Sequence, residues 1–183
     1  MTPTIPVTAT PAGLTGAELL ARTLFAEAGT RPVRAIEALA ALILNRARAH
    51  LPPRPPRVPG TAPFAPGGHA RLPEVTAREV AAACRTPFLF PSRNPRHPAH
   101  LRLVAPPETD LAMAICRRIA TRALAGVLPD PTGGATHWHG EEALPSWAVA
   151  HYPTAECGGL VFYRPDPAAP PARGATPTLV AAA

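Results

Sequence analysis

The chain has 183 residues, of which 46% are hydrophobic and 5% aromatic, and its formal net charge is +6. This length predicts one domain with its own core. The 27 prolines cluster in loops and tails, and the arginine-rich composition suits an anionic partner such as nucleic acid, anionic lipid or a cell-wall polymer. We find no apolar run long enough for a membrane span and no secretory signal, so we expect synthesis in the cytoplasm.

The three cysteines, Cys84, Cys116 and Cys157, are scattered along the chain. Their odd number and their spacing match neither a zinc site nor a paired disulfide framework. A Cys84–Cys116 bridge is possible, but we favour buried free thiols.

The first helix is predicted by a capping-box pattern, in which Thr15 caps the helix and Glu18 reaches back to the cap amide. Apolar residues at intervals of three and four follow, and they end in the carboxylate of Glu27. Gly29 can end the helix. Taken alone, Glu27 reads most simply as a solvated helix-end glutamate, but burial there would raise its pKa and make it a candidate general acid.

A second helix begins a few residues later. We expect Thr30 to cap it, with Pro32 tolerated in its first turn. A wide apolar stripe between Val33 and Ala47 marks this helix as central to the core. Residues 51–73 are rich in proline, glycine and arginine and predict a long surface loop.

Two further helices follow in the middle of the chain. A second capping box, from Thr76 to Glu79, opens a short helix through Cys84. Residues 87–95 form a rigid, partly apolar loop, and a helix beginning near residues 107–110 runs up to Gly126.

From residue 130 onward the pattern changes to strands. Residues 130–134 are typical of a turn, and residues 135–139 and 158–164 are strand candidates. We expect a loop over residues 141–156 between them. Helices followed by a small β element predict an α+β domain.

Histidines gather in the first of these strands. His137 and His139 would share one face, with His151, Glu141 and Glu142 nearby, which raises the possibility of a zinc site. No third ligand stands at a recognised spacing, so hydrogen bonding within a groove or core is the more common alternative. Between the two histidines, Trp138 would face the core.

Two other groups of residues suggest binding. Trp147, Tyr152 and Tyr163 could stack on sugar rings, although tryptophan in a small domain more often belongs to the core. Arginines from Arg46 to Arg57 form a basic run, but no aromatic interleaving or groove-reading helix accompanies it. We therefore do not expect nucleic-acid binding.

Together these segments resemble the SleB-type cell wall hydrolases, the spore-cortex-lytic family. The resemblance covers about residues 16–164 in the family's order, which is more specific than any single motif. It rests on residues 21–28 (ARTLFAEA), 40–46 (AALILNR), 130–139 (DPTGGATHWH), 145–148 (PSWA) and 161–164 (VFYR).

The resemblance implies a lysozyme-like α+β fold, mainly helical with a small antiparallel β element near the C-terminus. It implies a catalytic domain at residues 15–165, between a flexible segment at 1–14 and a disordered Pro/Ala-rich tail at 166–183. The implied reaction is cleavage of the peptidoglycan glycan strand between N-acetylmuramic acid and N-acetylglucosamine. Glu27 matches the family's catalytic acid, and several family members are lytic transglycosylases.

The expected groove and partners follow from the same resemblance. We expect no cofactor or metal, a monomer, and action in the periplasm or cell wall after non-standard export or lysis. We also expect the His139 side chain to lie within reach of the sugar or of Glu27. The substrate-binding candidates are Asn94, Thr136, His137, His139 and Tyr163.

The sequence also departs from the family pattern. Arg31 stands where the family often has an acid, and Leu160 where it often has a histidine. Residues 88–91 read FLFP where Phe-Gln-Phe-Ser is common, so Leu89 and Pro91 replace polar groups. The changes at Leu89, Pro91 and Leu160 leave open a catalytically impaired peptidoglycan-binding module. The histidines His137 and His139 leave open, as a less favoured alternative, a metal-dependent hydrolase.

Overall fold

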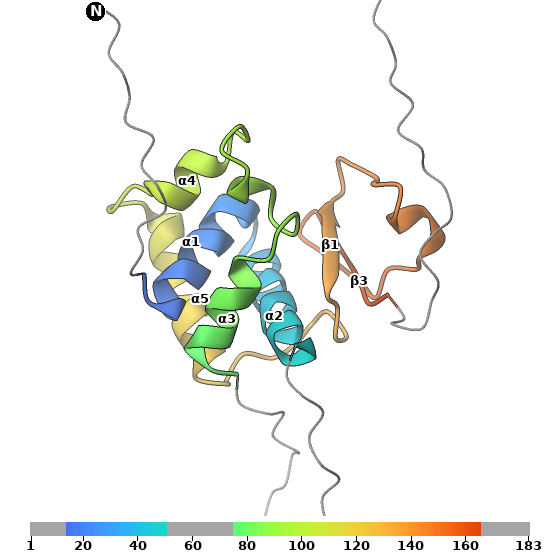
Figure 1. Ribbon diagram of the computed structural model, residues 1–183, viewed down its shortest axis with the longest axis horizontal. Coiled ribbons are helices and arrows are strands. Elements are labelled where there is room, and N and C mark those ends of the chain that lie inside the picture. The colour runs from blue at the N-terminus through green and yellow to red at the C-terminus, as the bar shows by residue number, and fades with distance from the viewer. Residues whose placement is uncertain (1–13, 51–74, 166–183) are drawn as a thin grey trace, which may run out of the picture.

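The computed structural model describes residues 14–50 and 75–165. Over these ranges, five α-helices pack together and a small sheet lies beside α2 (Figure 1). No helix in these ranges combines the length and apolar character needed to cross a bilayer. The elements, in chain order, are α1 (Gly16–Ala28), α2 (Val33–Ala49), α3 (Ala77–Cys84), the 3-10 turn η1 (Pro91–Arg93), α4 (His100–Val104), α5 (Leu111–Leu124), β1 (His137–Gly140), the 3-10 turn η2 (Ala148–Ala150), β2 (Ala155–Cys157) and β3 (Leu160–Tyr163).

Three predicted segments lie wholly or almost wholly outside the described residues. These are the flexible N-terminal segment at 1–14, of which only Leu14 is described, the long loop at 51–73 and the tail at 166–183. They stay predictions.

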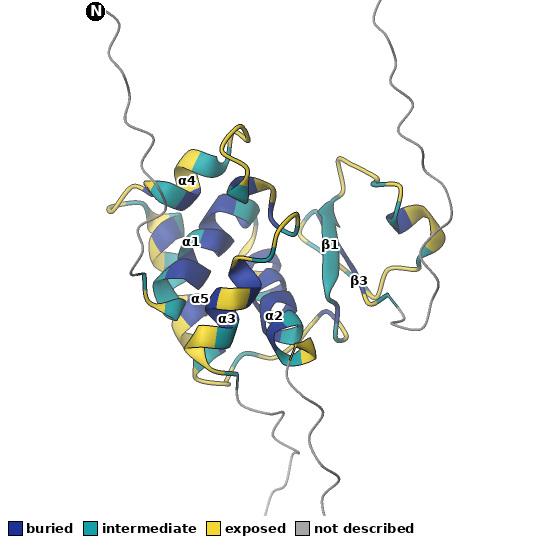
Figure 2. Ribbon diagram, in the orientation of Figure 1, coloured by how far each residue is buried: buried dark blue, intermediate teal, exposed yellow. Residues whose placement is uncertain are grey.

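The core is built around α1, which contacts each of the other four helices. Its apolar residues are buried on most of its circumference, as the dark blue ribbon in Figure 2 shows. Leu19, Leu20 and Leu24 have no exposed surface, and each such side chain contributes roughly 1.5–3 kcal/mol relative to an exposed one. At Gly16 a Cβ would lie 2.2 Å from the carbonyl oxygen of Ala77, so glycine permits the close approach of α1 to α3.

The predicted helix ends are confirmed at α3 and, in part, at α1. Both hydrogen bonds of the second capping box form, between Thr76 and Glu79. The Thr15 hydroxyl accepts from the Glu18 amide, but the Glu18 carboxylate does not return to the cap. It instead binds the guanidinium groups of Arg22 and Arg117, because α5 packs close to this side of α1.

The turn between α1 and α2 corrects one expectation. Gly29 ends α1 as predicted, with φ +59° and its amide bonded to the Phe25 carbonyl. Thr30, however, does not cap α2. The Arg31 amide bonds to the Ala28 carbonyl, so the turn closes tightly. Helix α2 begins two residues later than expected, with Pro32 at its N-cap and no side-chain cap.

The sheet has three antiparallel strands in the order β1-β3-β2. His137 pairs with Tyr163 and His139 with Val161, while Cys157 of β2 pairs with Leu160. The two predicted strands are confirmed; β2 lies at the end of the segment expected to be a loop. The fold class, mainly helical α+β with a small antiparallel sheet near the C-terminus, is also confirmed.

A partly buried polar network joins α2 to the segment before β1. The Asn45 amide on α2 donates to Asp130 Oδ2 at 2.9 Å and to the Ala135 carbonyl at 3.2 Å. Burial opposes ionisation of Asp130, but hydrogen bonds from Thr132, Asn45 and Gly134 hold its pKa below the usual value. Two of the segments that suggested the family, 40–46 and 130–139, are therefore in direct contact.

The cysteines are free thiols, as predicted. Cys84 and Cys116 are buried, and burial raises the pKa of each thiol to about 12. Cys157 on β2 is partly exposed.

The network at Asn45 gives a test of the fold. Asn45→Ala should lower the free energy of unfolding by about 1–3 kcal/mol, because it leaves Asp130 and the Ala135 carbonyl short of a donor. Asn94→Ala is the matched control, since the Asn94 side chain accepts only the Arg96 amide on an exposed loop. Denaturant unfolding measures both. Equal losses in the two variants would contradict the role of Asn45.

Candidate active site

Glu27 lies in the last turn of α1, partly buried. The backbone amide of Ser92 donates to its Oε1 at 2.9 Å. Burial raises the pKa of the Glu27 carboxyl, and contact with Ser92 opposes this shift in part. The side chain can therefore hold a proton at a pH where an ordinary glutamate has lost it.

The 3-10 turn η1 (Pro91–Arg93), which we call the Ser92 turn, is held in place by several contacts. Ser92 is fully buried in η1, and its carbonyl oxygen lies 2.8 Å from Nδ1 of His100 at the start of α4. Phe90, just before the turn, is 1% exposed and anchors it in the core. A rigid turn fixes the amide that faces Glu27. Sequence reasoning missed Ser92 and His100 as site residues.

A second group of polar and aromatic rings, partly or fully buried, lies on β1, β3 and the loop between β1 and β2. The ring centroids of His137 and His139 lie 5.6 and 5.9 Å from that of Trp147. Tyr163 lies 5.4 Å from His139 and 5.3 Å from Trp147. We call these four residues the aromatic cluster. The loop between β1 and β2 brings Trp147 over the two strands.

Hydrogen bonds fix the tautomer of His139. Its Nδ1 lies 2.7 Å from the Gly140 carbonyl oxygen, which can only accept, so Nδ1 carries the hydrogen. With the hydrogen on Nδ1, Nε2 can accept from the Tyr163 hydroxyl, which lies 3.0 Å away. Both ring nitrogens are thus engaged, and His139 orients Tyr163. It makes no bond to Glu27.

Thr136 and His137 form the edge of the cluster. The Thr136 hydroxyl lies 3.1 Å from His137 Nδ1, and the Thr136 carbonyl accepts from Arg46 at 2.7 Å. Burial, then the charges of Arg46 and His151, lower the pKa of His137. His137 is therefore a neutral hydrogen-bonding ring at neutral pH.

The structure thus divides the predicted site residues into two groups. Thr136, His137, His139 and Tyr163 lie together on the sheet. Asn94 follows the Ser92 turn, exposed, with its side-chain oxygen bonded to the Arg96 amide. Among the described residues no hydrogen bond joins Glu27 to the sheet group, and the roles of all these residues stay predictions.

The histidines do not belong to a metal-ligand cluster. Within residues 14–50 and 75–165, no three His, Cys, Asp or Glu side chains are grouped so that they could hold a metal ion. Trp138, between the histidines, packs against the core as expected.

The departures from the family pattern have structural explanations. Leu160 is 1% exposed, and Leu89 is partly buried and packs against the core. Arg31 pairs with Glu142 at 3.1 Å and donates to the Gly158 carbonyl, tying the α1–α2 turn to the β-strand region. Pro91 begins η1, and the serine that contacts Glu27 follows it directly.

Two solved structures share this fold. The catalytic domain of the Bacillus cereus SleB protein has a TM-score of 0.52 at 20% identity, covering 85% of this chain and 95% of its own. The catalytic domain of the germination-specific lytic transglycosylase SleB from Bacillus anthracis has a TM-score of 0.53 at 19% identity, covering 84% and 99%. No protein-family model and no curated sequence matches the chain. The SleB-type, lysozyme-like fold implied by the sequence motifs is therefore confirmed.

The raised pKa of Glu27 predicts a pH-dependent stability difference. Between the ordinary glutamate pKa and the raised one, the unfolded chain loses its proton while the folded chain keeps it, so stability falls as pH rises. Glu27→Gln removes this term. Melting curves from about pH 4 to 8 should show the wild type losing stability relative to the variant, and parallel curves would contradict a raised pKa.

Proposed function

We propose that the chain is an SleB-type enzyme that cleaves peptidoglycan glycan strands between N-acetylmuramic acid and N-acetylglucosamine. The observation that carries the proposal is Glu27: a carboxyl at the end of a core helix, with a raised pKa and a rigid amide against one oxygen. The shared fold with SleB catalytic domains supports the same conclusion. The site of action we propose is the periplasm or cell wall.

In this proposal Glu27 acts as a general acid. Its proton passes to the glycosidic oxygen as the bond to the anomeric carbon breaks, and the departing sugar leaves with a free hydroxyl. Charge then appears on Glu27, and the Ser92 amide, already 2.9 Å from Oε1, stabilises that charge.

The second half of the reaction needs no carboxylate partner. Among the described residues, the acids nearest in sequence to the aromatic cluster are Glu141 and Glu142; both are exposed, and Glu142 is paired with Arg31. The muramyl 6-hydroxyl can attack the anomeric carbon and return its proton to Glu27, giving an anhydro sugar. This route restores the acid without a nucleophile from the protein.

The aromatic cluster supplies a surface suited to a sugar chain. Trp147 offers a partly exposed apolar ring that packs on the buried ring of Tyr163, while Thr136 and His137 offer hydrogen-bonding groups beside it. We propose that this surface binds the strand, with His139 orienting the Tyr163 hydroxyl.

The proposed acid has a direct test. Glu27→Gln should abolish release of muropeptides from purified sacculi, a loss of at least about 100-fold. The amide keeps the shape of the side chain and an oxygen for the Ser92 amide but has no acidic proton. Soluble fragments are quantified by chromatography, with circular dichroism as a check on folding.

Glu108→Gln is the control, because Glu108 is exposed and forms only a surface pair with Arg117. It should release fragments at the wild-type rate. Undiminished release by Glu27→Gln would remove Glu27 from the reaction. Sedimentation of the wild type with sacculi, without soluble products, would instead indicate a binding module.

The chemical route predicts the product. Mass spectrometry of the released muropeptides should show muramyl ends that have lost one water, the mark of ring closure by the 6-hydroxyl. Reducing ends in place of anhydro ends would show that water is the acceptor. The acid would then stand, but the intramolecular step would be wrong.

A further inference from the structure

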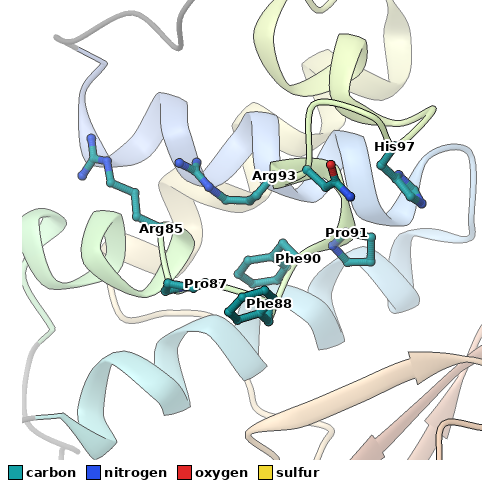
Figure 3. Close-up of a pocket in the computed structure, with 8 residues that line it drawn as sticks. Arg85, Pro87, Phe88, Phe90, Pro91, Arg93 and His97 are labelled. Carbon is teal, nitrogen blue, oxygen red and sulfur yellow. The ribbon is translucent and has the colours of Figure 1, made fainter. Parts of the chain in front are cut away.

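A hollow of about 570 Å³ opens on the surface beside the Ser92 turn. Figure 3 shows its walls: Phe88 and Phe90 lie close together, the Arg93 side chain extends above them, and Arg85 and His97 stand at opposite ends of the view. Its lining residues are Arg85, Pro87, Phe88, Phe90, Pro91, Arg93, Asn94 and His97.

The polar part of this hollow is cationic or neutral. It contains two arginines, a histidine and an asparagine, and no acidic residue among those the structure describes lines it. Nη1 of Arg93 is buried without a hydrogen-bond partner among the described residues. The positive charges of the Arg93 and Arg85 guanidinium groups suit the hollow to a bound anion.

The apolar part is unusual for a surface loop. Phe88 is fully exposed and has φ +61°, a backbone conformation that a bulky residue seldom adopts. The loop therefore holds an aromatic ring in solvent, in a strained conformation, next to two arginines. This arrangement fits a ligand that carries both apolar groups and negative charge.

The hollow borders the proposed acid. Pro91 lines it, and the next residue, Ser92, donates its amide to Glu27. A group attached to the sugar whose bond Glu27 protonates would lie within reach of this hollow.

We propose that the hollow binds the peptide stem of the muramyl residue, with Arg85 and Arg93 recognising its carboxylates and Phe88 packing on its aliphatic groups. The inference rests on the proposed function and extends it: the substrate is stem-bearing glycan in preference to bare glycan. The stem is favoured over other wall anions because it is covalently attached to the cleaved sugar, beside Glu27.

The test compares two substrates that have the same glycan strand and differ only in whether they carry peptide stems. Sacculi are digested with an amidase that removes the stems, and stem-bearing and stem-free strands of matched length are prepared. The wild type should show a kcat/KM about tenfold higher on stem-bearing strands, mainly through KM, as expected for an interaction formed with a charged group.

The arginines are tested by the double variant Arg85→Gln/Arg93→Gln. Its preference for stem-bearing strands should fall to within about twofold of unity. Arg85 is exposed, so Arg85→Gln alone should leave the fold intact. This single variant should reduce the preference even if the Arg93 change perturbs the loop. Arg118→Gln, an exposed arginine on α5, is the control and should keep the preference.

Binding gives a readout independent of turnover. In the Glu27→Gln background, stem-bearing strands should bind about tenfold more tightly than stem-free ones, and Arg85→Gln should remove part of that difference. Equal cleavage and equal binding of the two substrates by the wild type would overturn the stem site while leaving the glycan-cleaving function intact. Cleavage of neither substrate would overturn the proposed function itself, and binding in the Glu27→Gln background would still decide the stem site.

Discussion

The hydrogen bond between the Ser92 amide and the Glu27 carboxyl is the interaction on which the site depends. Burial favours the protonated acid, whereas the amide favours the carboxylate, and the net result is a pKa that is raised. A general acid must both release and recover its proton. The opposed effects keep Glu27 capable of both, provided that the turn carrying Ser92 stays rigid, which His100 and the buried Phe90 ensure.

The proposed sugar-binding surface lies on another part of the fold, and different interactions hold it. The aromatic cluster lies on strands more than a hundred residues from Glu27 in sequence, so its position depends on tertiary contacts. Asn45 on α2 binds Asp130 and the Ala135 carbonyl just before β1, and Arg31 ties the α1–α2 turn to the β-strand region. The same two helices that bury the core therefore carry both the acid and the anchors of the sheet.

Local patterns were enough to predict much of this arrangement. Helical spacing placed Glu27 at the end of α1, and the Thr76 box marked α3, because both signals lie within one or two turns. The contact with Ser92 spans 65 residues and has no local signature. The three-residue strand β2 lacks the alternation that marks longer strands, and its existence depends on pairing with β3. The sequence also predicted Thr30 as the N-cap of α2, but the tight turn after α1 puts Pro32 at that position.

The departures from the family pattern illustrate why a residue's burial must be known before its loss is judged. Leu89 and Leu160 replace polar residues, yet both pack in or against the core, where an unpaired polar group would be costly. The polar groups that face the acid come instead from the neighbouring turn, through Ser92. Under the proposed function, the polar contact to the acid is made by Ser92, next to Pro91, and the cationic hollow lies beside the same turn. If the proposed function holds, a change in which part of the peptidoglycan is recognised explains these substitutions better than a loss of activity, because Glu27 and the Ser92 amide are both in place.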